Sequence, residues 1–279
     1  MCIRDRATAP LFLGLLLLMG IAPLSAYGRS TWKTLGRGLW KPALASLAIP
    51  AVLLWQGLSN YGAILGYWIL GFVTLVTLYE FWRAARARHA RHGENLFQSL
   101  WRLAGRNRRR YGGYVIHLGV VLMGLGIIGI ELFQTETQAT LAQGEQLTLG
   151  RYVMTFDALS QFDTLDGRNV TRAVVSVYED GEYAGELYPR KDYYYASQQP
   201  VTIPGVRSTL EDDFYVLMVG WEPIGAQGAT FKVYHNPLVN FVWLGGLVFI
   251  LGTMVAAWPD RDPEPVPVRV SARARAVRA

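Results

Sequence analysis

The sequence predicts a polytopic α-helical membrane protein with about five spans and an extracytoplasmic β-rich domain inserted between the last two. First, 51% of the 279 residues are hydrophobic and only 17% are charged, which is too apolar for an ordinary soluble protein. Second, the apolar residues gather in runs long enough to cross a bilayer. Third, residues 134–235 contain no such run and carry 14 acidic against 7 basic side chains.

Five apolar runs predict the membrane spans, four of them within residues 7–133 and the last within residues 236–258. They lie at about Ala9–Tyr27, Pro42–Gln56, Tyr61–Phe81, Gly112–Phe133 and Pro237–Ala257. The second run is short and contains Pro50, so a re-entrant segment is the alternative. With five crossings, however, all three basic segments fall on one side, as the positive-inside rule requires. These segments are residues 28–41, residues 82–110 with nine arginines, and the tail after Trp258.

Residues 134–235 read as a β-rich domain. A hairpin is predicted from residues 171–178 and 183–188, because Asp180-Gly181 between them suits a type I′ turn. Further strands are expected at Gln146–Phe156, Tyr215–Trp221 and Thr230–Tyr234. Residues 259–279, rich in Pro, Val and Arg, are predicted to be a disordered cytoplasmic tail.

Composition also excludes several classes of function. The net charge is +6, but the basic residues flank the apolar runs, so nucleic-acid binding is rejected. Cys2 is the only cysteine, which leaves no internal disulfide and no thiolate metal site. The four histidines are too scattered for a zinc motif. Residues 1–6 lack the apolar core of a signal peptide, so this start suggests a truncated reading frame.

His117 is the residue most suggestive of function, because it is a titratable ring inside the apolar run Gly112–Phe133. Three interpretations stay open on composition alone: a hydrogen bond to a neighbouring helix, ligation of a porphyrin or metal, and a proton relay. The helical neighbours of His117 include two glycines that leave room for a flat group or for another helix. These neighbours are Gly113, Tyr114, Val120, Val121 and Gly124.

The stretch Arg108-Arg109-Arg110-Tyr111-Gly112-Gly113-Tyr114-Val115-Ile116-His117 resembles a helix motif of the CcmF family of cytochrome c maturation proteins. Val233-Tyr234, Asn236-Pro237-Leu238-Val239-Asn240 and Trp243-Leu244-Gly245-Gly246 resemble the start of that family's last membrane helix, and Trp258-Pro259-Asp260 its exit. The resemblance covers about Ala7 to Asp260 and includes a β-rich domain of similar size.

The resemblance implies a haem-handling subunit of a haem lyase in the bacterial inner membrane, with residues 134–235 on the periplasmic side. It implies that His117 is an axial ligand to the iron of a haem b, with Gly113, Tyr114 and Gly124 beside the haem. It also implies that the protein helps attach haem to apocytochrome c. The implied partners are the haem chaperone CcmE, the subunits CcmH and CcmI, apocytochrome c and membrane lipid.

The chain also departs from the family pattern. The family's tryptophan-rich haem segment, its flanking histidines and the other haem b ligand have no match among these residues. The chain therefore resembles the C-terminal half alone, with the N-terminal half as a further partner, and this fragment is not expected to be active by itself. No nucleophile or acid–base pair is visible, so no catalytic residue is assigned.

Two rival functions remain. The first is a membrane-tethered β-domain that acts only as an assembly module, with His117 packing helices together. The second is a transporter, which should show broken helices or inverted repeats that this sequence lacks. Tyr193-Tyr194-Tyr195 and Trp221 could form an aromatic contact surface for a partner, but core burial explains them equally well. The other polar candidates are expected to be solvated or interfacial: His89, His92, Glu131, Glu211-Asp212-Asp213 and His235.

Overall fold

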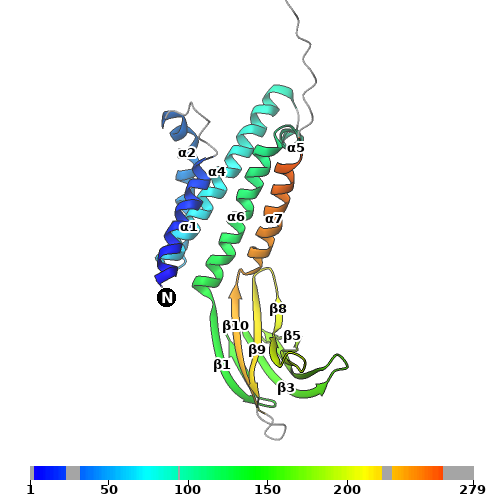
Figure 1. Ribbon diagram of the computed structural model, residues 1–279. Coiled ribbons are helices and arrows are strands. Elements are labelled where there is room, and N and C mark those ends of the chain that lie inside the picture. Colours follow the sequence, from blue (N-terminus) through cyan, green and yellow to red (C-terminus); the bar gives the residue numbers. More distant parts are fainter. Residues whose placement is uncertain (1–2, 23–31, 94, 222–227, 260–279) are drawn as a thin grey trace, which may run out of the picture.

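The computed structural model describes residues 3–22, 32–93, 95–221 and 228–259. It consists of a bundle of helices standing on a β domain (Figure 1). The β domain is inserted in the chain between the last two helices, and these two helices lie side by side in the bundle. The predicted fold class, a polytopic helical membrane protein with a β domain, is confirmed.

Within the described residues, four helical segments are long and apolar enough to span a membrane, and all four overlap predicted spans. They are Gly38–Trp55, Tyr61–His92, Arg108–Phe133 and Asn240–Ala257. The apolar part of the first helix, Thr8–Ile21, is shorter, and the rest of the first predicted span lies outside the described residues. The helices are α1 (Ile3–Ile21), α2 (Trp32–Ser46), α3 (Ala48–Trp55), α4 (Tyr61–His92), α5 (Leu96–Arg106), α6 (Arg108–Phe133) and α7 (Asn240–Ala257).

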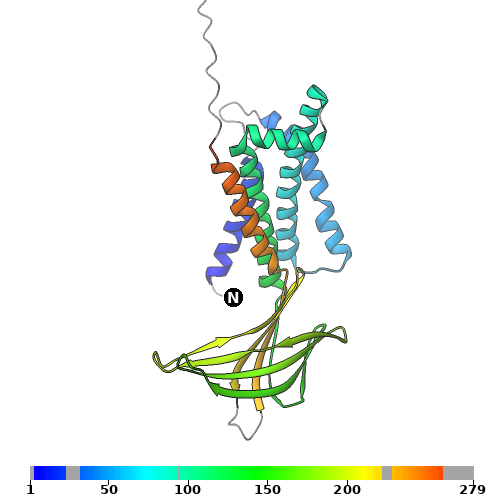
Figure 2. The ribbon, with the colours of Figure 1, turned by 90° about the vertical axis from the view of Figure 1, so that its right-hand side faces the viewer.

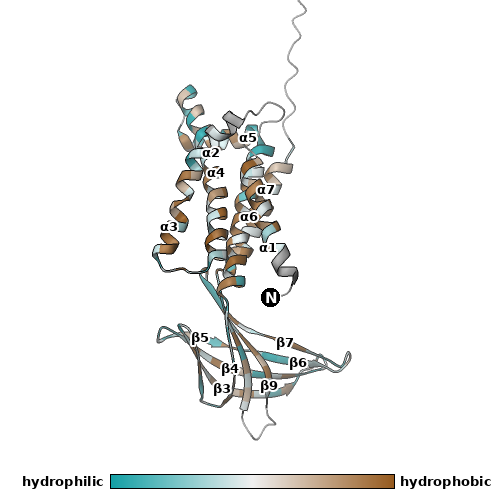
Figure 3. Ribbon diagram, turned by 90° about the vertical axis from the view of Figure 1, so that its left-hand side faces the viewer, coloured by the Kyte–Doolittle hydropathy of each residue, from teal (hydrophilic) through white to brown (hydrophobic). Residues whose placement is uncertain are grey.

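The course of the chain agrees with the predicted charge asymmetry. The first helix begins at the end of the bundle nearest the β domain, and successive spans alternate in direction (Figures 1 and 2). The two helices α2 and α3 follow one another to make a single crossing (Figure 3). The arginine-rich connection between α4 and α6 lies at the end of the bundle far from the β domain.

The predicted basic loop at residues 82–110 is largely helical, which corrects the sequence interpretation. Helix α4 continues to His92 and ends at Gly93 in the left-handed conformation, with φ at 65°. Helix α5 then lies across the ends of the spans (Figure 2). Alanine and arginine favour helix, so α4 extends past the apolar run. His89 and His92 therefore lie on a helix rather than in a loop.

Helices α6 and α7 pack closely because glycines line their contact. Gly112, Gly119 and Gly126 recur every seven residues on α6. A Cβ at Gly119 would come within 2.6 Å of the backbone nitrogen of Phe249, and one at Gly112 within 2.6 Å of that of Ala256. Small residues at such contacts let helix backbones approach in membranes. This contact fixes one face of α6 against α7.

The β domain contains two antiparallel sheets among the described residues. One has the strand order β1-β10-β9-β8; the other has the order β2-β3-β4-β6-β7, with β5 also paired to β4. The strands are β1 (Thr135–Ala142), β2 (Gln146–Leu149), β3 (Tyr152–Asp163), β4 (Arg168–Glu179), β5 (Glu182–Leu187), β6 (Arg190–Tyr194), β7 (Gln199–Ile203), β8 (Gly205–Ser208), β9 (Asp212–Trp221) and β10 (Gly228–Pro237).

The two sheets enclose a core of their own. Alternate residues along β3, β4, β9 and β10 are buried, as expected of strands with one face on a core. Aromatic contacts join the sheets, including Tyr152 stacked on Phe214 with ring centroids 4.6 Å apart. Figure 3 shows strands with mixed apolar and polar residues, in contrast to the predominantly apolar helices.

The predicted hairpin is confirmed, because β4 pairs with β5 across Asp180 and Gly181, whose φ angles are 50° and 87°. The strand expected at Gln146–Phe156 is wrong as a single element. It is two paired strands, β2 and β3, that reverse at Gly150, where φ is 60°. A glycine in the left-handed region permits this tight reversal. Strands β1, β6, β7 and β8 were not predicted.

Candidate haem-ligand site and buried polar clusters

His117 lies on α6 about 14 Å from the first residue of that helix, at 1.5 Å per residue. The residue is half-buried. Its Nδ1 atom is buried and has no hydrogen-bond partner among the described residues. Among the described residues, the ring has no hydrogen bond to a neighbouring helix of the kind that the packing interpretation of His117 predicts.

The three predicted neighbours of His117 differ in their surroundings. A Cβ at Gly113 would meet no described atom within 4 Å, so the turn before His117 has open space. Tyr114 is buried, and its ring contacts Phe81 of α4 at 5.3 Å between centroids. The space beside Gly124 is filled, since a Cβ there would come within 2.8 Å of the Leu70 side chain. Of the two glycines expected to leave room, only Gly113 does so.

A buried carboxylate, missed in the sequence interpretation, lies near this site. The Glu80 side chain on α4 is only 2% exposed and forms ion pairs with two arginines. Arg83 Nη2 lies 2.9 Å from Glu80 Oε1, and Arg110 Nη2 lies 3.3 Å from Glu80 Oε2. Arg110 Nε also donates a hydrogen bond of 3.0 Å to the Tyr114 hydroxyl. The signal available was an acidic residue ending an apolar run, which is rare without a partner.

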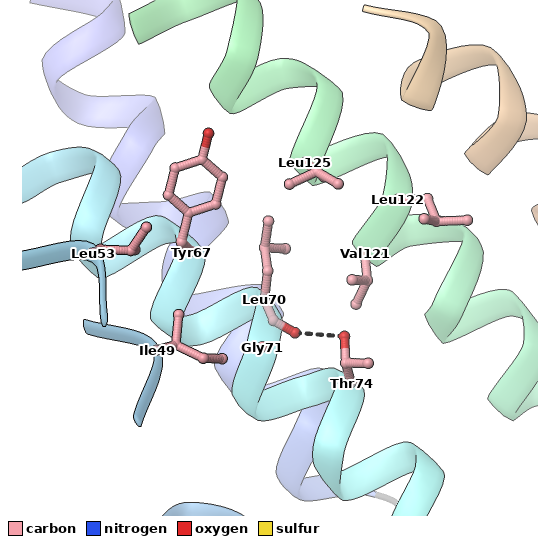
Figure 4. A pocket seen from close by; sticks show the side chains of 9 residues that line it. All are labelled: Ile49, Leu53, Tyr67, Leu70, Gly71, Thr74, Val121, Leu122 and Leu125. Atoms are coloured by element: carbon pink, nitrogen blue, oxygen red, sulfur yellow. Dashed lines mark hydrogen bonds between the residues drawn. The ribbon is translucent and has the colours of Figure 1, made fainter. Parts of the chain in front are cut away.

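An apolar cavity of about 330 Å³ opens between α3, α4 and α6 (Figure 4). The Thr74 hydroxyl faces this cavity but donates to the Leu70 carbonyl of its own helix at 2.8 Å. His117 is not part of the lining, which comprises Ile49, Leu53, Tyr67, Leu70, Gly71, Thr74, Val121, Leu122 and Leu125. The cavity therefore offers apolar contact and little hydrogen bonding.

A second buried polar cluster surrounds Asp212, where the β domain meets α7. Its Oδ2 atom lies 2.7 Å from His235 Nε2 and 2.8 Å from Arg151 Nη2. Its Oδ1 atom accepts hydrogen bonds from the hydroxyls of Tyr152 and Thr209. The sequence interpretation of Asp212 as a solvated residue is wrong, because Asp212 is 3% exposed and begins β9.

The partners of Asp212 decide which ionisation states this cluster favours. Burial alone would raise the pKa of Asp212, but hydrogen bonds from His235, Tyr152 and Thr209 outweigh it and hold that pKa below its usual value. Burial, together with the hydrogen bond to Asp212, raises the pKa of Tyr152 to about 12. The cluster therefore keeps a carboxylate and a neutral phenol side by side.

The structure brings part of the predicted aromatic surface together. Tyr193, Tyr195 and Trp221 line a groove of about 480 Å³, to which both sheets contribute, since Trp221 ends β9 and Tyr193 lies on β6. The ammonium of Lys191 lies 5.5 Å from the Trp221 ring centroid. The remaining lining residues are Gln161, Asn169, Thr171 and Pro200. Tyr194 is not among them.

The other candidate residues give less support to a functional site. Glu131 is exposed near the end of α6. No group of three or more His, Cys, Asp or Glu side chains suited to a metal ion occurs in the described parts of the chain.

The comparisons with known proteins agree with this arrangement. Residues 132–237 match the family model described as the CcmF C-terminal beta-sandwich. The chain is 25% identical to the cytochrome c-type biogenesis protein CcmF of Haemophilus influenzae over 88% of its own length. The resemblance to the C-terminal part of CcmF is confirmed. The chain is also 27% identical to the biogenesis protein CycK of Rhizobium meliloti over 96% of its length.

A solved structure of the cytochrome c heme lyase CcmF has the same fold. It superposes with a TM-score of 0.72 and 25% sequence identity over 91% of this chain. The match covers 40% of the CcmF chain in that structure, 36% of the H. influenzae CcmF and 38% of CycK. This chain therefore spans well under half the length of these relatives.

Proposed function

We propose that this chain is the haem-handling C-terminal part of a cytochrome c maturation haem lyase, and that His117 is one axial ligand of a membrane-embedded haem b. The observation that carries the proposal is the buried His117 Nδ1 atom, which has no hydrogen-bond partner among the described residues. A buried polar atom without a partner is costly and calls for an explanation. A ligand that is absent from the chain supplies one.

The residues around His117 fit a haem in two respects. The imidazole has no hydrogen bond to a described residue that would compete for its lone pair. The open space beside Gly113 lies one turn towards the start of α6, and helix side chains lean in that direction. A bound haem b supplies reversible one-electron chemistry. The chain contributes an imidazole and an apolar wall, which tune the reduction potential through ligation and burial.

The second axial ligand and the segment that contacts apocytochrome c belong, in this proposal, to the N-terminal half that the longer relatives carry. The assembled protein takes haem from CcmE and works with CcmH and CcmI to attach it to the Cys-X-X-Cys-His thiols of apocytochrome c. We place the β domain on the periplasmic side of the bacterial inner membrane. The arginine-rich connection between α4 and α6 then faces the cytoplasm, as the positive-inside rule favours.

The alternative is that the chain acts only as a membrane-tethered assembly module. The groove lined by Tyr193, Tyr195 and Trp221 favours this candidate, since exposed aromatic side chains are common at protein interfaces. Under that alternative, the full-length protein shows no haem absorbance, and His117→Ala leaves the capture of a partner intact.

The experiment is an absorption spectrum of the protein in detergent, produced together with its N-terminal part. We expect reduced haem b bands in the wild type and their loss in His117→Ala. His92→Ala is the matched control, because His92 is exposed at the far end of α4. Near-ultraviolet circular dichroism checks that the variant is folded. Unchanged bands in a folded His117→Ala variant would refute the ligand assignment.

A further inference from the structure

Arg110, Gly113 and His117 form a stripe on α6, at intervals of three and four residues. Such residues lie on one face of a helix. The guanidinium of Arg110 stands at one end of the stripe and the imidazole of His117 at the other. Seven residues separate them, or about 10.5 Å along the axis. Between them Gly113 leaves open space, since a Cβ there would meet no described atom within 4 Å.

The Arg110 side chain is fixed from two sides. Its Nε donates to the Tyr114 hydroxyl at 3.0 Å, and its Nη2 lies 3.3 Å from Glu80 Oε2. Tyr114 and Glu80 are both buried, so they hold the guanidinium in one place. The Arg110 side chain nevertheless remains 56% exposed. Its Nη1 atom has no partner among the described residues.

We propose that Arg110 binds a propionate carboxylate of the haem that His117 ligates. This proposal rests on the proposed function and adds the group that orients the haem on α6. A haem carries two carboxylates on one edge of its ring, and arginine pairs with carboxylates through parallel N–H donors. Glu80 and Tyr114 are positioning residues, because they hold the guanidinium without contacting the haem.

The geometry favours a carboxylate over other partners of Arg110. The guanidinium is near the end of the bundle where α6 begins, so it lies close to the membrane surface. A carboxylate at that point gains charge-assisted hydrogen bonds, which are stronger than those between neutral groups. The apolar part of the same ligand would then lie over Gly113.

The experiment compares haem b with its dimethyl ester, in which both carboxylates are blocked. Apoprotein is prepared from the full-length protein and titrated with each pigment. We expect the wild type to bind haem b roughly tenfold to a hundredfold more tightly than the ester, the value of one hydrogen-bonded charge pair. Equal binding of the two pigments by the wild type would overturn the proposal directly.

The variant Arg110→Gln should lose this discrimination, whereas Arg108→Gln should keep it. Arg108 carries the same charge two residues earlier, but it lies on the α7 side of α6, where its Nη1 donates to the Pro259 carbonyl at 2.9 Å. Arg110→Gln should also lower the reduction potential of the bound haem, because removal of a nearby cation favours ferric iron. A folded Arg110→Gln variant that discriminates as the wild type does would refute the assignment.

Two further variants separate the outcomes. If Arg110→Gln does not fold, because Glu80 loses a partner, the double variant Glu80→Gln/Arg110→Gln removes both charges and takes its place. His117→Ala tests the proposed function itself. If His117→Ala loses haem but Arg110→Gln behaves as Arg108→Gln, only the propionate assignment fails. If His117→Ala retains haem, the proposed function fails first.

Discussion

The Asp212 carboxylate and the His117 imidazole are both buried polar groups, but they differ in how completely their own atoms are partnered. Asp212 has hydrogen-bond or ion-pair contacts to four side chains, from Arg151, Tyr152, Thr209 and His235. His117 Nδ1 has none among the described residues. A carboxylate whose two oxygens are both partnered is explained by the fold alone. For the imidazole nitrogen, our proposal places the missing partner outside this chain.

The largest effect should come from removing the Asp212 carboxylate. We expect Asp212→Ala to lower the free energy of unfolding of the β domain by about 3–5 kcal/mol, because Tyr152, Thr209 and His235 lose the buried acceptor that they share. Thermal unfolding followed by near-ultraviolet circular dichroism measures the change. The control Glu211→Gln, whose side chain is 79% exposed, should cost less than about 0.5 kcal/mol. Equal costs would show that the cluster is not structural.

Two adjacent glycines sharpen the comparison on α6. Gly112→Ala should destabilise the α6–α7 contact by about 1–3 kcal/mol, since the new methyl group meets the backbone of Ala256. Gly113→Ala should not destabilise the protein, because no described atom lies within reach. It should instead weaken haem retention if the ring lies over that turn. Thermal stability and haem content of the two variants, measured together, check both statements.

A smaller effect is expected for the ion pairs of Glu80. Glu80→Ala should cost about 1–2 kcal/mol, less than Asp212→Ala, because Arg83 and Arg110 are about half exposed and regain water. Thermal unfolding in detergent gives the value. Arg86→Ala, a neighbouring arginine that faces the Trp82 ring, is the control for helix propensity and charge. A cost equal to that of Asp212→Ala would mean that Arg83 and Arg110 do not regain water when Glu80 is removed.

The smallest effect is the pH dependence of the stability of the β domain, because stability should change little around neutral pH. Tyr152 has its pKa raised from 10.0 to about 12, so its contribution is complete below pH 10 and is lost as the pH rises through about 12. Asp212 has a lowered pKa, so its contribution is complete above the ordinary carboxyl range and is lost as the pH falls through the folded value. Tyr152→Phe should remove the alkaline loss, whereas Tyr193→Phe should leave it.

Much of the fold could be predicted because its signals are local. Apolar runs located the spans, and Asp180-Gly181 located a hairpin turn. The pairing of β1 with β10 depends on residues about a hundred positions apart, which no local pattern encodes. The sequence interpretation missed the helices in residues 82–110, because it took the many charged residues there as the sign of a loop. Arginine and alanine nevertheless favour helix.

The site could be predicted only in part for the same reason. His117 stood out as a histidine inside an apolar run. The ion pairs of Glu80 with Arg110 join residues 30 positions apart, and His235 pairs with a carboxylate 23 positions away. Whether a glycine faces open space or another helix depends on packing. Gly112 and Gly113 are adjacent in the chain, yet only the second has space beside it.

Imidazole rescue tests the central claim most directly. In the full-length protein, His117→Gly removes the side chain and leaves the helix backbone in place. We expect the haem b bands to disappear in this variant and to return when free imidazole is added, whereas His92→Gly should need no rescue. Haem bands that persist in His117→Gly without imidazole would contradict the account, because iron would then be held by other residues.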